Sequence, residues 1–373
     1  MKKPRLLFVT VLVLIPRFVI AEVDLEKRQQ QLMADDKKAI LGAQLFHDTS
    51  LSNPPGQSCA SCHKPDKVFS DGLVVSEGAT KGVFGRRNTP MLTYAKYAIP
   101  FHKFEFRDRW AGGFFWDGRA ATLEDQALGP LFNPLEMNTT QDALAEKLRS
   151  AAYAKQIAAL FGKEVLESDW AMVRAAAIAI ANFERTDLFS PFSSKYDYVK
   201  AGKATFTDLE AKGEMLFQQQ GQCSECHQGA SYDGRELFTS YDFHNIMLPK
   251  NRNSPFFLQK NGFNADVENF VDVGLAANEE LSRVYADMVR GQFRTPSLRN
   301  IELTAPYMHN GIFNTLEEVM AYYAANGSHN RKLEAAEVPE NRSSNLPESL
   351  DINQEDVKAL IAFMLTLTDG YEP

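Results

Sequence analysis

Two stretches, Cys59-Ala60-Ser61-Cys62-His63 and Cys223-Ser224-Glu225-Cys226-His227, decide the fold of this chain. Each places two thiols one helical turn apart and an imidazole directly after them, which is the attachment pattern of a c-type haem. The two motifs use all four cysteines, so no thiol is left for a disulfide or a zinc site. A Cys-x-x-Cys pair alone also fits a redox dithiol or half of a zinc site, but the histidine after both pairs favours haem. We therefore predict two covalently bound haem c groups, with His63 and His227 as the lower axial ligands of the two irons.

The first residues have the pattern of a secretory signal. Lys2, Lys3 and Arg5 precede an apolar run at 6–15, and a second apolar patch ends in the small residue Ala21. We expect residues 1–21 to be cleaved and the mature protein to be periplasmic, without a membrane anchor. An uncleaved anchor is the weaker alternative, because the apolar run is short for a bilayer and is interrupted at Pro16.

Charge excludes one class of partner. The formal net charge is −8, and loss of residues 1–21 removes four cationic and no acidic side chains, which brings it to −12. So acidic a protein repels phosphate backbones, and nucleic acid is not an expected partner.

The chain contains a tandem repeat. Residues 42–46 and 213–217, Gly-Ala-Gln-Leu-Phe and Gly-Glu-Met-Leu-Phe, each precede a haem motif, and residues 116–125 align with 309–318 at a constant offset of 193 positions. A break in the helical pattern at Ser190-Pro191-Phe192 marks the boundary. We predict an N-terminal haem domain at 22–190 and a C-terminal haem domain at 191–373.

Periodicity indicates a mainly α fold, two tandem cytochrome c-like domains with long loops. Residues 169–184 repeat apolar side chains at helical spacing behind a Ser168 cap, forming a stripe of Trp170, Val173, Ile180 and Phe183. Residues 353–368 form a second amphipathic segment. We expect this terminal helix to pack on the helix before the second haem loop. Strand patterns are scarce, and 231–292 predicts loops near the second haem.

The upper face of each iron decides the function. An iron with two protein ligands passes electrons, whereas an iron with a vacant position can bind and split peroxide. The repeat places Pro130 opposite Tyr323. Proline has no donor atom for iron, but a tyrosinate oxygen is one.

The chain resembles the bacterial di-haem cytochrome c peroxidase and MauG family over nearly its whole mature length. The matching stretches are Arg87-Asn88-Thr89-Pro90, Phe115-Trp116-Asp117-Gly118-Arg119-Ala120, Asn133-Pro134-Leu135-Glu136-Met137, Pro296-Ser297-Leu298-Arg299-Asn300 and 304–311, Thr-Ala-Pro-Tyr-Met-His-Asn-Gly. In the peroxidases of that family a methionine is the upper ligand of the second haem, and in the MauG branch it is a tyrosine. The corresponding residue is Tyr323, with Met308 and Tyr322 as competing candidates.

The resemblance also implies an open first haem. Many of the peroxidases carry a histidine on the loop after the first motif that closes the site, and residues 64–87 contain none. His102 is the nearest later candidate for such a closing ligand.

Further roles follow from the resemblance alone. It implies that Glu136 is the general acid/base for O–O cleavage, that Gln126 is a polar companion, that Pro130 lies above the first iron, and that Trp116 lies between the haems. It also implies one calcium ion held by Asn88, Thr304 and Pro306, through an amide oxygen and main-chain carbonyls.

These features predict an oxidoreductase of the MauG kind. It would use hydrogen peroxide, or O₂ plus electrons, to oxidise tryptophans of a partner, the methylamine dehydrogenase precursor or a similar periplasmic protein, and so complete tryptophan tryptophylquinone. One alternative is a cytochrome c peroxidase that draws electrons from a small cupredoxin or cytochrome c. A non-catalytic di-haem electron carrier is the third.

Overall fold

The computed structural model describes residues 35–373 except 105–108, 220, 229–230, 260–266, 282, 325–334 and 347–349. The predicted signal at 1–21 lies outside these residues. Within the described ranges, no helix is both long enough and apolar enough to cross a membrane.

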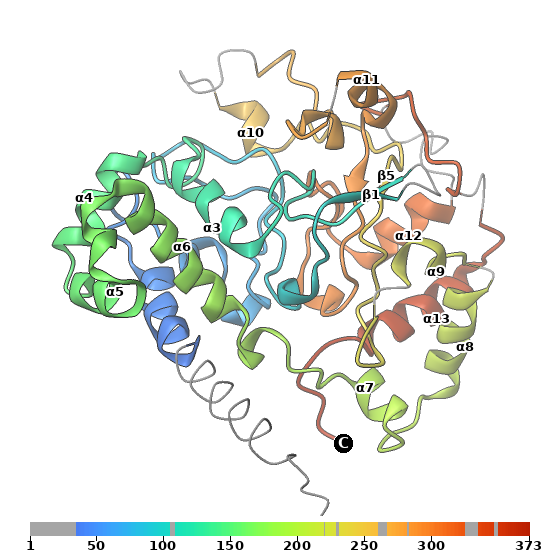
Figure 1. The fold of residues 1–373 in the computed structure, drawn as a ribbon. Helices are drawn as coiled ribbons and strands as arrows, with labels where there is room; N and C mark the ends of the chain where they lie inside the picture. Colours follow the sequence, from blue (N-terminus) through green and yellow to red (C-terminus); the bar gives the residue numbers. More distant parts are fainter. Residues whose placement is uncertain are drawn as a thin grey trace, which may run out of the picture.

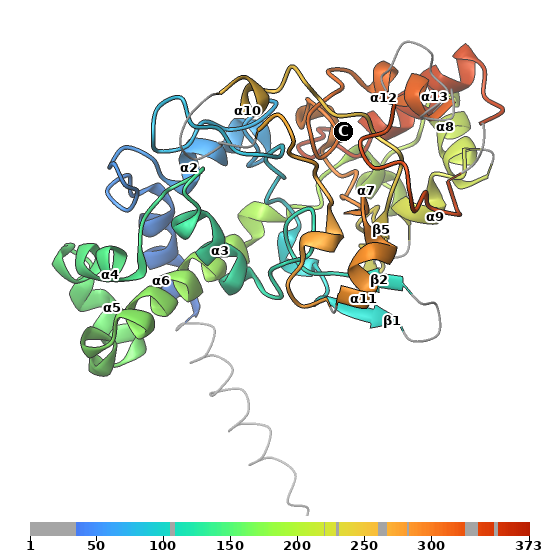
Figure 2. The ribbon, with the colours of Figure 1, turned by 90° about the horizontal axis from the view of Figure 1, so that it is seen from above.

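The mainly α prediction is confirmed. Two helical lobes lie side by side (Figures 1 and 2). Beyond the helical residues 35–47, the first half of the chain forms α2 (Cys59–Cys62), α3 (Leu123–Phe132), α4 (Gln141–Ser150), α5 (Ala154–Phe161) and α6 (Asp169–Glu184). The second half forms α7 (Lys195–Lys200), α8 (Asp208–Gln218), α9 (Ser224–His227), α10 (Pro255–Leu258), α11 (Arg283–Ala286), α12 (Leu316–Ala324) and α13 (Gln354–Leu365).

The strands form three short antiparallel ribbons among the described residues. They pair β1 (His102–Phe104) with β2 (Arg109–Ala111), β3 (Ser231–Tyr232) with β4 (Arg235–Glu236), and β5 (Phe243–His244) with β6 (Phe293–Arg294). The segment at 231–292, predicted as loops, contains three of these two-residue strands, β3, β4 and β5, and two one-turn helices, α10 and α11.

A close helix crossing organises the first lobe. The helix at 35–47 meets α6 at Gly42, where an added Cβ would lie 1.9 Å from the carbonyl oxygen of Ala179. Four residues further along the first helix, the ring of Phe46 contacts that of Phe183 with centroids 5.3 Å apart. Glycine is required here because no other residue lets the two backbones approach so closely.

The second lobe repeats this crossing. Gly213 of α8 meets α13, and an added Cβ would lie 1.9 Å from the carbonyl oxygen of Ala359. The ring of Phe217, four residues after Gly213, contacts that of Phe363 of α13, with centroids 5.3 Å apart. The terminal helix therefore packs on the helix before the second haem motif, as the sequence predicts.

Side-chain caps explain where the long helices begin. Ser168 accepts a hydrogen bond from the amide of Ala171 at the start of α6, and Asn353 accepts from Glu355 and Asp356 at the start of α13. Each cap satisfies an amide that has no partner inside its helix. The two helices predicted from periodicity thus begin where their capping residues stand.

Elements cross between the lobes. The β1–β2 ribbon comes from the first half of the chain but lies beside β5 and α11 (Figures 1 and 2); Trp110 contacts Tyr285, and Gly112 donates to the carbonyl of Tyr241 over 3.0 Å. In return, α10 of the second half buries Phe256 against Val75, Val83 and Leu135 of the first. Each half of the chain thus packs a segment against the lobe formed by the other half.

We expect Gly213→Ala to lower the free energy of unfolding by about 1–3 kcal/mol, the cost of overpacking a tight interface. The loss should occur even though alanine is the better helix former by about 1 kcal/mol. Gly85→Ala is the control, because its added Cβ meets only the Ser76 carbonyl oxygen, at 3.7 Å. Denaturant unfolding measures both variants, and equal stabilities would contradict the close crossing.

Candidate functional site

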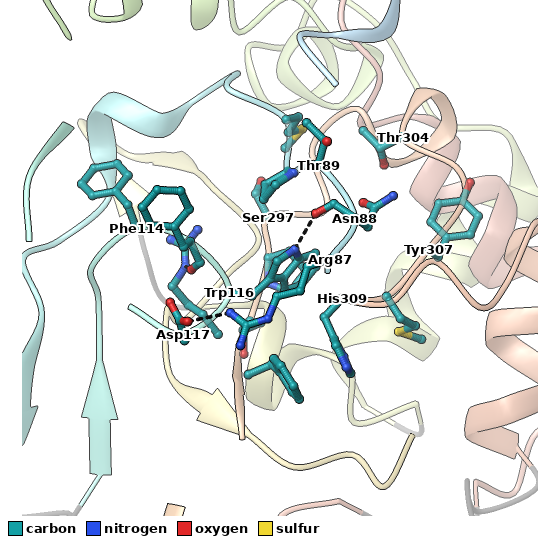
Figure 3. Close-up of a pocket in the computed structure, with 18 of the residues that line it drawn as sticks. Arg87, Asn88, Thr89, Phe114, Trp116, Asp117, Ser297, Thr304, Tyr307 and His309 are labelled. Atoms are coloured by element: carbon teal, nitrogen blue, oxygen red, sulfur yellow. Dashed lines mark hydrogen bonds and ion pairs between the residues drawn. The ribbon is translucent and has the colours of Figure 1, made fainter. Parts of the chain in front are cut away.

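One cavity of about 820 Å³ is shared by the two haem motifs. It is lined by both attachment sets, Cys59, Cys62 and His63 from the first half and Cys223, Cys226 and His227 from the second. Figure 3 shows part of the cavity wall, where Arg87, Trp116 and His309 lie close together. Two prosthetic groups attached to these motifs would therefore occupy connected space.

Both motif histidines are oriented for binding iron. The Nδ1 atom of His63 bonds the carbonyl oxygen of Phe69 at 2.7 Å, and that of His227 bonds the carbonyl oxygen of Phe238 at 3.3 Å. Such a bond on Nδ1 directs Nε2 toward a metal. Burial lowers the pKa of His63, and lowers that of His227 to about 4, so both imidazoles are in the neutral form that binds a metal.

The surroundings of the thiols differ from those of a redox dithiol. Burial raises the pKa of Cys59 to about 12 and that of Cys226 to about 11, whereas redox-active dithiols have a lowered thiol pKa. All four cysteines are free. The protein environment therefore fits covalent haem attachment better than thiol exchange.

Two equivalent helices cover this cavity. Turns with matching hydrogen bonds, Phe114 to Ala120 and Tyr307 to Phe313, both 2.7 Å, lead into α3 and α12. The same four positions of each helix then face the cavity: Leu123, Gln126, Ala127 and Pro130 in α3, and Leu316, Val319, Met320 and Tyr323 in α12. The repeat found in the sequence is therefore also a repeat in space.

Tyr323 is the tyrosine of α12 that faces the cavity. Burial, ahead of the neighbouring cysteines, raises the pKa of its phenol, so the phenolate requires a cation beside it, such as a ferric iron. Tyr322 packs on Phe313 and donates its hydroxyl hydrogen to the carbonyl oxygen of Ile246 over 2.8 Å. Met308 also lines the cavity, on the turn before α12.

Glu136 lies just after α3 and lines the cavity close to the first haem motif. Asn133 donates to its Oε1 over 2.6 Å. Burial raises the pKa of Glu136, while Arg119 and Asn133 partly oppose the rise. Gln126 is nearby on the same wall, and its buried Oε1 has no hydrogen-bond partner, which leaves an acceptor for a ligand or water.

Trp116 lies at the centre of the residues drawn in Figure 3. Its Nε1 donates to the backbone oxygen of Asn88 over 2.9 Å, and its ring meets that of His309 edge-on at 6.4 Å. Next to it, Arg87 bonds both Asp117 (2.6 Å) and Asp272 (2.7 Å). The indole is thus held by a hydrogen bond and surrounded by a buried ionic cluster.

The three residues of the predicted calcium site line the same cavity: Asn88, Thr304 and Pro306. The Nδ2 atom of Asn88 donates to the carbonyl oxygen of Leu73 over 2.8 Å, which leaves Oδ1 of the same amide as a hard ligand atom. The described residues hold no cluster of three or more His, Cys, Asp or Glu side chains suited to a metal, so a cation here would depend on amide and carbonyl oxygens.

His102 lies away from the haem motifs. It belongs to β1, bonds the carbonyl oxygen of Pro100 at 2.8 Å, and packs on the exposed ring of Phe104. The reason is that the β1–β2 ribbon crosses to the second lobe, which carries His102 away from the first iron position.

Sequence reasoning missed two cavity residues. Glu184 is 3% exposed with an unpartnered Oε2, and burial raises its pKa to about 8. Its position three helical turns after the buried Val173 was the available signal. His309, stacked on Phe293 at 3.5 Å, stands opposite Trp116 in the repeat, and that alignment was the signal for it.

Known proteins match this chain over most of its length. The family described as di-haem cytochrome c peroxidase matches residues 36–205. The methylamine utilization protein MauG of Paracoccus denitrificans is 41% identical, with 92% of each chain covered. The chain belongs to the di-haem cytochrome c peroxidase and MauG family.

Other relatives agree with this assignment. The cytochrome c551 peroxidase of Nitrosomonas europaea is 31% identical, covering 90% of this chain and 80% of that one. The crystal structure of the diheme peroxidase BthA from Burkholderia thailandensis superposes with a TM-score of 0.79 at 32% identity, covering 89% and 86% of the two chains. The protein is therefore a peroxidase-like oxidoreductase with two haem groups.

Replacing Tyr323 tests whether its phenolate is the upper ligand of the second haem iron. Tyr323→His should convert its absorption and electron paramagnetic resonance (EPR) spectra to those of bis-histidine ligation, because imidazole replaces phenolate oxygen. Tyr322→Phe is the matched control and should leave the spectra unchanged while costing about 1 kcal/mol for the lost hydrogen bond. Unchanged spectra in Tyr323→His would identify another ligand, with Met308 the next to test.

Proposed function

We propose that the protein uses hydrogen peroxide, or O₂ plus electrons, to oxidise tryptophan side chains of a periplasmic partner, completing tryptophan tryptophylquinone in the methylamine dehydrogenase precursor. The observation that carries this proposal is the pairing of Pro130 and Tyr323 at equivalent, cavity-facing positions. One position offers no donor to its haem and leaves it open. The other offers a hard oxygen, which favours retention of oxidising equivalents over electron uptake from a cytochrome.

When bound at His63, haem supplies the iron at which peroxide is cleaved. The protein has to move a proton from one peroxide oxygen to the other, and we assign this to Glu136. Its raised pKa brings the carboxyl nearer to working pH, and the bond from Asn133 fixes one oxygen so that the other can face the substrate. Gln126, with its free Oε1, would orient the peroxide or a water.

Trp116 would connect the two haems in this scheme. It lines the cavity that both motifs share, and its bond to the Asn88 oxygen fixes the indole. Two carboxylates lie next to it, those of Asp117 and Asp272, around Arg87. Electrons reach the haems through protein, so the partner's tryptophans need not enter the cavity.

We also propose that one calcium ion is bound by Asn88, Thr304 and Pro306. Asn88 then has two roles, because its side chain would bind the ion while its main-chain oxygen accepts the Trp116 hydrogen bond. A cation at this position would therefore stiffen the segment that positions the indole.

A cytochrome c peroxidase is the second candidate. The observation in its favour is Met308, which lines the cavity and would give the second haem a thioether ligand and a higher potential. A small cupredoxin or cytochrome c would then be the electron donor.

Glu136→Gln should keep both haems but slow the reaction with peroxide by about 100-fold or more, the usual contribution of a general acid/base. Stopped-flow absorption after peroxide addition measures the rate. Glu146→Gln, an exposed carboxylate on α4, is the control and should react as the wild type does. A wild-type rate in Glu136→Gln would remove this carboxyl from the mechanism.

The substrate is tested by mass spectrometry. The holoenzyme, mixed with peroxide and methylamine dehydrogenase precursor, should change the mass of the precursor's tryptophan-containing peptides by oxygen insertion and crosslinking. Peroxide without enzyme is the control. Unmodified precursor, together with rapid peroxide turnover driven by a reduced cupredoxin or cytochrome, would favour the peroxidase instead.

A further inference from the structure

Tyr94 is a buried tyrosine of the haem cavity whose hydroxyl meets a carboxylate. It is 2% exposed and lines the cavity shared by the two motifs. Its Oη donates to the carboxylate of Asp369, with distances of 2.9 and 2.7 Å to the two oxygens, and accepts from the amide of Phe192 at 3.1 Å. A phenol is thus aligned with a strong proton acceptor inside the redox cavity.

The backbone at Tyr94 is unfavourable for a tyrosine. Its φ is +65°, in the left-handed region. The stretch at 88–92, Asn-Thr-Pro-Met-Leu, is echoed at 294–298, Arg-Thr-Pro-Ser-Leu, and this alignment places Tyr94 opposite Asn300, whose φ is +59°. Asparagine tolerates this conformation, while a bulky aromatic residue adopts it at a cost in free energy. The contacts of the Tyr94 side chain therefore hold this residue in an unfavourable backbone conformation.

Another tyrosine of the same cavity provides a contrast. Tyr307 donates its hydroxyl hydrogen to the carbonyl oxygen of Ile301 over 3.1 Å. A neutral carbonyl oxygen is a poor proton acceptor, whereas the carboxylate beside Tyr94 can accept the phenolic proton when the ring loses an electron. Only the first of these two arrangements allows loss of an electron and a proton together.

We propose that Tyr94 and Asp369 form a proton-coupled electron donor to the haems, an inference that rests on the peroxide chemistry proposed above. When a peroxide-derived oxidising equivalent is not used by a partner, one electron passes from Tyr94 to the oxidised haem pair. The phenolic O–H bond breaks, its proton moves to the Asp369 carboxylate, and a neutral tyrosyl radical remains. The haem pair is reduced by one electron, so charge and protons balance.

The surroundings favour this coupling. The guanidinium of Arg299 lies 4.9 Å from the Tyr94 ring, and a cation there disfavours a charged radical that keeps its proton. Asp369 is held in place by Asn300 and by the amide of Ser193, at 2.8 and 2.9 Å. Burial raises the pKa of the Tyr94 phenol, so in the resting protein the proton is on the oxygen. The electron therefore leaves together with the proton.

The test adds peroxide to the holoenzyme without any partner protein and follows EPR and absorption. We expect a narrow organic-radical signal whose line shape changes in protein grown with ring-deuterated tyrosine. Tyr94→Phe should lose the signal and keep the peroxide-induced absorption change for longer. Asp369→Asn, which keeps the phenol but removes the proton acceptor, should also lose it, while Tyr307→Phe should behave as the wild type does.

Each other outcome overturns the proposal. An unchanged line shape with deuterated tyrosine would show that the radical is not on a tyrosine, whether or not any variant folds. A signal retained in Tyr94→Phe, or lost in Tyr307→Phe, would place it on another residue. A normal peroxide-induced absorption change with either result leaves the proposed function standing, whereas absence of any response to peroxide would remove both.

Discussion

The contact of a glycine with a carbonyl oxygen of a crossing helix, made once in each lobe, is the constraint on which the rest of the structure depends. Gly42 against Ala179 and Gly213 against Ala359 bring each pre-motif helix onto the last helix of its lobe. The haem motif starts a short loop later, so this crossing sets where the motif histidine stands. The same geometry appears twice, and the packing of the two lobes brings both motifs to one cavity.

A second repeated unit forms the opposite wall of that cavity. Helices α3 and α12 present the same four positions to it, and the difference between the two haem environments comes down to which side chains occupy those positions. Pro130 and Tyr323 are one such pair, Gln126 and Val319 another. Duplicated architecture therefore produces two unlike sites, because the backbone is shared and the chemistry is carried by single side chains.

The space between the haem motifs belongs to neither lobe alone. Arg87 and Trp116 come from the first half of the chain, and Asp272 and His309 come from the second. The crossing of β1–β2 and α10 between lobes holds these segments together. Tyr94 and Asp369 join the same two halves, so a redox role for this pair would depend on the assembled interface.

The sequence by itself determined the number of haem motifs, the histidine of each, the helices at 169–184 and 353–368, and the repeat that aligns Pro130 with Tyr323. These are local patterns, set by covalent spacing or by helical periodicity. Tertiary structure alone decided that the strand carrying His102 packs on the second lobe, that Trp170 of the apolar stripe is 51% exposed, and that Glu184 is buried. The reason is physical: which face of a helix is buried, and where a ribbon packs, are both set by contacts with segments far away in the chain.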